Sequence, residues 1–209
     1  GALSYSYPGP ADQGRKLRAM LTAYTAAGGR DAAFLLHSEG AGTRLIGELG
    51  RAARVDRAIR GVPARVLPVA LWHTASVGLD LWLAAIAQGA SQVWLLLTEE
   101  EAPEYRTALA EQMAVGQAIL HGLGYAGEHF RLIEARDARD LPALDLALRA
   151  PAAQTVARPA SFAAQAAKRA TLDLALDHLM AQAPQQADEI ALPASGAPFG
   201  TLAIDTNRC

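Results

Sequence analysis

The chain has little cysteine, little lysine and little net charge, and it lacks long apolar runs. Its one cysteine is Cys209, which excludes an internal disulfide and any all-thiolate metal site within the chain. A net charge of -2 supplies no long-range attraction for nucleic acid or an anionic membrane surface. No apolar run reaches the roughly 18 residues that a membrane span needs. We therefore expect no nucleic acid, no membrane span and a cytoplasmic location.

What the sequence has is an alternation of apolar runs and helical patterns. With 51% hydrophobic and 19% charged residues in 209, the composition is that of a globular domain. Short apolar runs predict strands, which lie at residues 31–37, 64–71, 91–98 and 130–134. Helical patterns follow each run, at residues 40–54, 77–88, 102–122 and 140–149. Successive β-α units predict an α/β fold, a three-layer parallel sheet of about four strands with helices on both faces. Pro68 places the second strand at an edge or a bulge.

Further segments flank this core. A helix is predicted at residues 11–27, an Ala-rich helix at 159–183, and an extended tail after it. We divide the chain into four parts, which are residues 1–30 (an N-terminal segment and lead-in helix), 31–150 (the α/β domain), 151–184 (an accessory helix) and 185–209 (a linker).

The carboxyl ends of the predicted strands are the expected binding edge, because ligands of open parallel sheets bind there. The candidate cofactor-binding residues are His37, Gly40 and Gly42 around the end of the first strand, His73 and Thr74 after the second, and Thr98 and Glu99 after the third. Imidazole and carboxylate groups together bind divalent metals or transfer protons. The alternative, which we favour, is that the histidines cap the strands and that residues 99–101 form the solvated first turn of a helix.

Nucleotide-binding and nucleophilic motifs are incomplete. Gly40 and Gly42 lie where a dinucleotide fingerprint would, but its third glycine is replaced by Leu45, which favours a plain loop. Lys16 and Lys168 are the only lysines and neither belongs to a P-loop, and no G-x-S-x-G elbow is present. We expect no catalytic residue, and an enzymatic role for this chain is less expected than a binding or structural one.

Both ends of the sequence resemble parts of bacterial ferredoxins. Gly1-Ala2-Leu3-Ser4-Tyr5 is similar to the stretch that follows the last cluster cysteine of those proteins. Residues 197–209 look like the lead-in to a ferredoxin module, with Cys209 at the position of its first cluster cysteine. The resemblance implies a domain between two ferredoxin-like segments, with Cys209 as a [4Fe-4S] ligand in the full-length protein only.

The interior has a second resemblance. Residues 31–150, most clearly 66–97, resemble the delta-subunit family of F420-non-reducing hydrogenase, a small iron-sulfur domain. In that family, cysteines at the strand ends hold a cluster. The corresponding residues here are not cysteines; they lie around Leu36 and Ser38, at His73, at Thr98 and near Pro103. The resemblance implies a scaffold that no longer holds its own cluster.

Three functions follow as hypotheses. The first is a cluster-free scaffold or docking domain of an iron-sulfur electron-transfer protein, without a cofactor in this chain. Its expected partners are the flanking ferredoxin modules, which hold the [4Fe-4S] clusters, and an unknown redox protein. The second is a nucleotide- or small-molecule-binding domain that uses the loops at residues 38–43, 73–76 and 98–101. The third is docking of a partner on the helix at residues 161–180, through Leu172 and Leu176.

Overall fold

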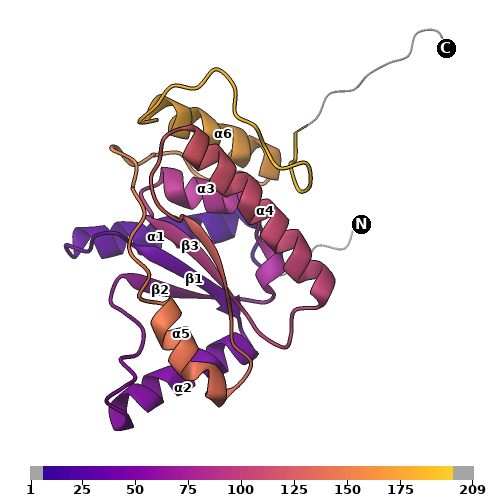
Figure 1. Ribbon diagram of the computed structural model, residues 1–209. Coiled ribbons are helices and arrows are strands. Elements are labelled where there is room, and N and C mark those ends of the chain that lie inside the picture. Colours follow the sequence, from indigo (N-terminus) through magenta and orange to yellow (C-terminus); the bar gives the residue numbers. More distant parts are fainter. Residues whose placement is uncertain (1–6, 200–209) are drawn as a thin grey trace, which may run out of the picture.

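The structure, a computed structural model, describes residues 7–199 and confirms the predicted α/β class. Four parallel strands form one sheet in the order β2-β1-β3-β4 (Figure 1). The strands are β1 (Ala33–Ser38), β2 (Val66–Leu71), β3 (Gln92–Leu97) and β4 (Phe130–Glu134). Every residue of the two central strands, β1 and β3, is buried, which explains their largely apolar sequence.

Helices cover both faces of the sheet, as the sequence predicts (Figure 1). One face carries α2 (Ala41–Val55) and α5 (Leu141–Ala147), which pack on the odd-numbered side chains of β1 such as Leu35. The other face carries α1 (Pro10–Ala26), α3 (Leu79–Ala87) and α4 (Pro103–Gly122), whose core includes Phe34. Single 3-10 turns precede α3 and α5, namely η1 (Thr74–Ser76) and η2 (Ala138–Asp140).

Of the two positions predicted for the second strand, an edge or a bulge, the structure has the edge. β2 pairs with β1 alone, and Pro68 lies opposite Leu35 in that ladder. Proline has no N–H to donate to a neighbouring strand. A strand that contains proline is therefore found at the edge of a sheet, where one side has no neighbouring strand to bond.

The C-terminal helix is shorter than predicted. The sequence pattern predicts residues 159–183, whereas α6 spans Lys168–Ala181. Residues before it run along the domain instead: the Ala160 N–H donates to Ala87 O at 2.8 Å, and Ala164 is buried against α1. Tertiary packing outweighs the helix propensity of these alanines, because propensity alone is worth only tenths of a kcal/mol per residue.

Packing of α6 also corrects the third hypothesis. The helix lies on α3, where Leu172 and Leu179 are buried in the main core (Figure 1). Of the two leucines named for docking, Leu172 is therefore part of the core of this domain, and Leu176 packs against that core and is partly buried.

The tail also packs on the domain as far as it is described. The Gln185 N–H donates to Leu123 O at 3.1 Å, and Ile190 and Phe199 lie against the core. The predicted [4Fe-4S] ligand Cys209 lies outside the described residues. None of the helices within residues 7–199 is both long and apolar enough to cross a bilayer.

Candidate functional site

The strand order creates a switch point between β1 and β3. From β1 the chain passes through α2 toward β2, and from β3 it passes through α4 toward β4, on the opposite side. The two loops diverge at this point, and ligands of open α/β sheets bind in the crevice between such loops. His37 pairs with Leu96 in the β1–β3 register, so residues 38–42 and 98–101 leave the sheet next to each other.

Two of the predicted site residues meet on one carboxylate, that of Glu101. The Thr98 backbone N–H donates to Glu101 Oε2 at 2.7 Å, and the Thr98 hydroxyl donates to the same oxygen at 3.1 Å. The Thr74 hydroxyl donates to Glu101 Oε1 at 2.8 Å. All three residues are buried. The prediction of a solvated turn is thus wrong for Glu101, whose carboxylate joins the ends of β2 and β3.

The sequence contains a signal for part of this role of Glu101. Thr98-Glu99-Glu100-Glu101 has the T-x-x-E spacing of a capping box, in which the glutamate side chain reaches back to the threonine backbone N–H. The spacing predicts the Thr98 bond, but it does not predict the bond from Thr74, which comes from another strand end.

Arg106 is a further residue that the sequence pattern did not single out. Its Nε–H donates to Glu101 O at 3.0 Å, and a second guanidinium nitrogen donates to Thr98 O. The third nitrogen lies 3.0 Å from Glu134 Oε2, at the end of β4. One guanidinium group therefore ties the β3 loop, α4 and β4 together, as its fork of donors permits.

The amino end of α2, where a phosphate would bind in a nucleotide-binding domain, already has acceptors from this chain. The Ala41 N–H donates to Glu100 Oε1 at 3.1 Å, and the Gly42 N–H donates to Ser38 Oγ at 2.9 Å. A Cβ at Gly40 would lie 2.3 Å from Glu100 Oε1. The absence of a side chain at the predicted residue Gly40 therefore leaves room for the Glu100 carboxylate.

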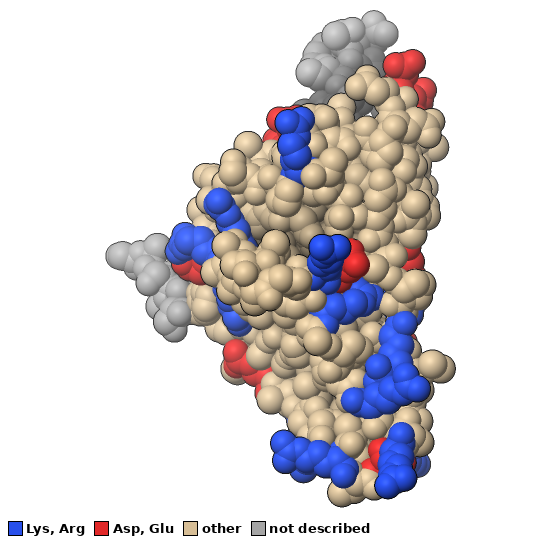
Figure 2. All heavy atoms as spheres, turned by 90° about the vertical axis from the view of Figure 1, so that its left-hand side faces the viewer, with Lys and Arg blue, Asp and Glu red and all other residues tan. Residues whose placement is uncertain are grey.

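Glu99 is the exposed member of the acidic run. It forms a 2.8 Å ion pair with Arg44 of α2, and both side chains are about half exposed. The hydrogen bond from Arg44 lowers the pKa of Glu99, so the group is ionised at neutral pH. Basic side chains gather at the level of α2 in Figure 2.

The two predicted histidines, His37 and His73, form hydrogen bonds to the backbone of residues close to them in the sequence. His37 is buried under α2; its Nδ1–H donates to Ser38 O at 2.9 Å, and a Cβ at Gly42 would lie 2.8 Å from its Cβ. Burial lowers the pKa of His37, and its hydrogen bond to Ser38 O offsets this in part. His73 accepts the Ala75 N–H on Nδ1 at 3.1 Å as the cap of η1. The capping role favoured from the sequence agrees with this geometry.

The residues at the strand ends do not fit an iron-sulfur cluster. A cubane cluster needs thiolates, whereas Leu36 is buried in the core and the hydroxyls of Ser38 and Thr98 are hydrogen-bonded locally. Within residues 7–199, no three His, Cys, Asp or Glu side chains are grouped to hold a metal ion.

Comparisons with protein-family models, with curated proteins and with solved structures found no match for this chain. The resemblances to ferredoxins and to the hydrogenase delta subunit therefore stay predictions from the sequence. The α/β class stands on the sheet itself.

Proposed function

We propose that this chain is a scaffold and docking domain of an iron-sulfur electron-transfer protein in the cytoplasm, and that it binds ferredoxin-like modules at the carboxyl edge of its sheet. One observation carries the proposal: this edge is closed by the carboxylates of Glu100 and Glu101, yet it presents exposed aromatic side chains. An edge that is internally hydrogen-bonded but aromatic on its surface suits contact with another protein better than capture of a ligand.

The aromatic surface consists of Trp72, which is 72% exposed, and Tyr105, which is 50% exposed. Tyr105 packs against His73 with the two rings tilted by 59° and 4.9 Å between their centroids. Tyr7 packs edge-on against Trp72 with 6.5 Å between ring centroids. The Tyr7 hydroxyl accepts a hydrogen bond from the backbone N–H of Trp72. Tyr7 follows the ferredoxin-like residues 1–5 closely, which supports the placement of a ferredoxin-like module beside this surface.

Nucleotide binding, the second hypothesis, has less support. A phosphate at the switch point would meet the carboxylates of Glu99, Glu100 and Glu101, and the Ala41 N–H that would bind it is already in use. A thermal-shift panel of flavins, nicotinamides and nucleotides should be flat, because a ligand at 100 times its dissociation constant would add about 2.7 kcal/mol of stability. A reproducible shift with any of them would favour this second function.

The indole N–H signals of the three tryptophans test the docking proposal. When a bacterial [4Fe-4S] ferredoxin is added to the ¹⁵N-labelled chain, the Trp72 signal should shift or broaden. The signals of Trp82 and Trp94 should stay in place, because both side chains are fully buried. Absence of any change at Trp72, or equal changes at all three, would contradict docking at this edge.

Anaerobic reconstitution with iron and sulfide tests the other half of the proposal. The chain should stay colourless and EPR-silent, since its strand ends offer no thiolate set. Uptake of a cluster in good yield would show that the chain is itself an electron carrier.

A further inference from the structure

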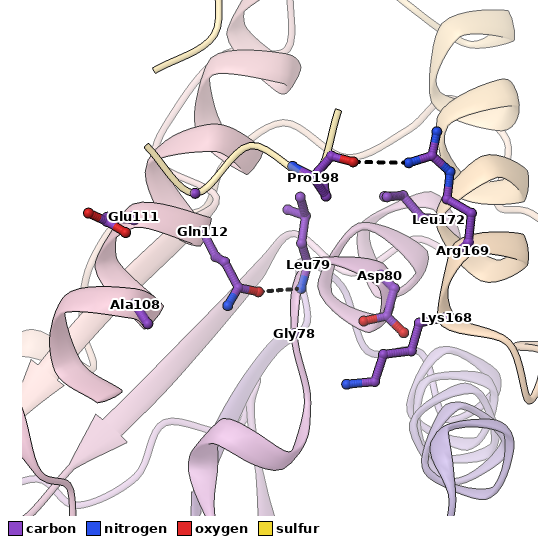
Figure 3. A pocket seen from close by; sticks show the side chains of 11 residues that line it. Gly78, Leu79, Asp80, Ala108, Glu111, Gln112, Lys168, Arg169, Leu172 and Pro198 are labelled. Carbon is purple, nitrogen blue, oxygen red and sulfur yellow. Dashed lines mark hydrogen bonds between the residues drawn. The ribbon is translucent and has the colours of Figure 1, made fainter. Parts of the chain in front are cut away.

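A cavity of about 440 Å³ lies away from the strand-end residues, on the face covered by α3, α4 and α6 (Figure 3). The amino ends of α3 and α6 and the middle of α4 form its walls, and residues 196–198 of the tail close one side. Gly196 has φ +77°, and a Cβ there would lie 2.8 Å from Glu111 Cβ, so the tail rests directly on α4. This volume is within the range of small-molecule sites.

The cavity is lined by a buried carboxyl group, one oxygen of which has no hydrogen-bond partner among the described residues. Asp80, in the first turn of α3, is only 6% exposed, and its Oδ2 has no hydrogen-bond partner among the described residues. Buried carboxyl oxygens are normally satisfied, because leaving one unpaired costs about 1–3 kcal/mol. Burial raises the pKa of Asp80, and the nearby positive charge of Lys168 opposes the rise. Oδ2 therefore lacks a hydrogen-bond donor, and the Asp80 carboxyl group is the acidic group that lines the cavity beside Lys168.

Lys168 is the matching cation. It is the first residue of α6, lines the same cavity, and makes no ion pair or hydrogen bond within the described part of the chain. Figure 3 shows its side chain passing close to Asp80. Arg169 beside it is engaged, with Pro198 O at 3.1 Å and Asp173 Oδ1 at 3.1 Å. The free N–H groups at the start of α6 add to the attraction of Lys168 for an anion.

The charges around the cavity are balanced. Asp80 and Glu111 are acidic, and Lys168 and Arg169 are basic. A simple cation or a simple anion would be attracted by one pair and repelled by the other, so it gains little from the site as a whole. A zwitterion satisfies both pairs, and the remaining wall is apolar, with Leu79, Ala108, Leu172 and Pro198.

We propose that this cavity binds a free α-amino acid with an apolar side chain. The ammonium group of the ligand donates to the Asp80 carboxylate, and its carboxylate lies by Lys168 at the start of α6. Its side chain packs on Leu172 and Pro198. This site is independent of the proposed docking edge, because Trp72, Tyr105 and the glutamates of that edge do not line it.

Calorimetry of the whole chain with alanine, valine, leucine, methionine and phenylalanine tests the proposal. At least one should bind saturably with one site per chain. Its amide, which lacks the carboxylate, and its N-acetyl derivative, which lacks the ammonium group, should each bind about ten-fold or more weakly, since each loses a charge-assisted hydrogen bond. If none of the five binds at millimolar concentration, or if the blocked forms bind equally well, the proposal is wrong.

Matched variants assign the binding to this cavity. Asp80→Asn and Lys168→Met should each weaken binding of the amino acid about ten-fold or more. Asp177→Asn, an exposed carboxylate further along α6, and Lys16→Met, the other lysine, should bind as the parent does. Asp80→Asn should also melt no lower than the parent, which separates loss of binding from loss of folding. Unchanged affinity in both cavity variants would overturn the assignment.

Discussion

At the scale of the residue, a few polar side chains determine what the carboxyl edge can do. Glu101 accepts three hydrogen bonds in a buried position, and two of them come from its own loop. Glu100 occupies the amino end of α2. From the sequence, these acidic side chains could be exposed metal ligands or residues of a first helical turn. In the structure, both accept hydrogen bonds from neighbouring segments of the chain.

Glu101→Gln should lower the free energy of unfolding by about 2 kcal/mol. The amide keeps one acceptor oxygen and turns an N–H₂ donor toward the donors of Thr98 or Thr74, so a buried donor loses its partner. Urea denaturation at neutral pH measures the change. Glu104→Gln, an exposed glutamate in the first turn of α4, is the control and should change stability by less than about 0.5 kcal/mol.

At the scale of the element, close approach explains why particular small residues stand where they do. Gly42 lets α2 lie against His37, and Gly14 of α1 lies against Ala164, where a Cβ would be 2.2 Å from the Ala164 Cβ. The same packing holds residues 159–167 out of a helix and sets the start of α6 at Lys168. Element boundaries here depend on neighbours, in addition to local propensity.

Leu179→Ala should cost about 2–5 kcal/mol, because Leu179 of α6 is completely buried against the core and its loss leaves a cavity. Leu174→Ala, on the same helix but 37% exposed, should cost much less. Chemical denaturation of the two variants compares them directly. Equal, small losses would mean that α6 is only loosely attached, which would return it to consideration as a docking helix.

At the scale of the whole molecule, two buried histidines make the fold sensitive to acid. His37 lies under α2, and His129 is fully buried before β4, where its Nε2 contacts Gln154 O at 3.0 Å. Burial lowers the pKa of both imidazoles, and hydrogen bonds to backbone oxygens offset only part of this. The folded chain therefore keeps both rings neutral at pH values where the unfolded chain would protonate them.

The free energy of unfolding should be constant above about pH 6.5, the unfolded value, and should fall as the pH is lowered below it. The loss should end below the depressed pKa values of the folded state, where both states are protonated. Replacement of His37 and His129 by glutamine should flatten this dependence between about pH 7 and 5, as urea titrations at each pH would show. His178→Gln, on α6, should retain the acid sensitivity of the parent; if it flattens the curve as much, the buried pair is not the cause.

The sequence predicts much of the fold and less of the site. Apolar runs such as residues 91–98 identify β3 because a strand buried on both faces must be apolar throughout. Thr74 and Thr98 are correctly placed at the carboxyl edge of the sheet, since parallel strands end at the same edge. Their shared partner Glu101 was not predicted from the pattern, because its burial depends on a third strand end and on Arg106.

The sequence by itself determined the α/β class, the parallel sheet with β2 at its edge, and the absence of a thiolate set at the strand ends. These properties follow from composition, periodicity and single residues such as Pro68, which act within a few residues of the chain. Only the tertiary structure decided that the switch point is closed by glutamates, that α6 begins at Lys168, and that Asp80 is buried with Oδ2 unpaired. These features depend on contacts between segments far apart in the chain, and packing in three dimensions determines such contacts.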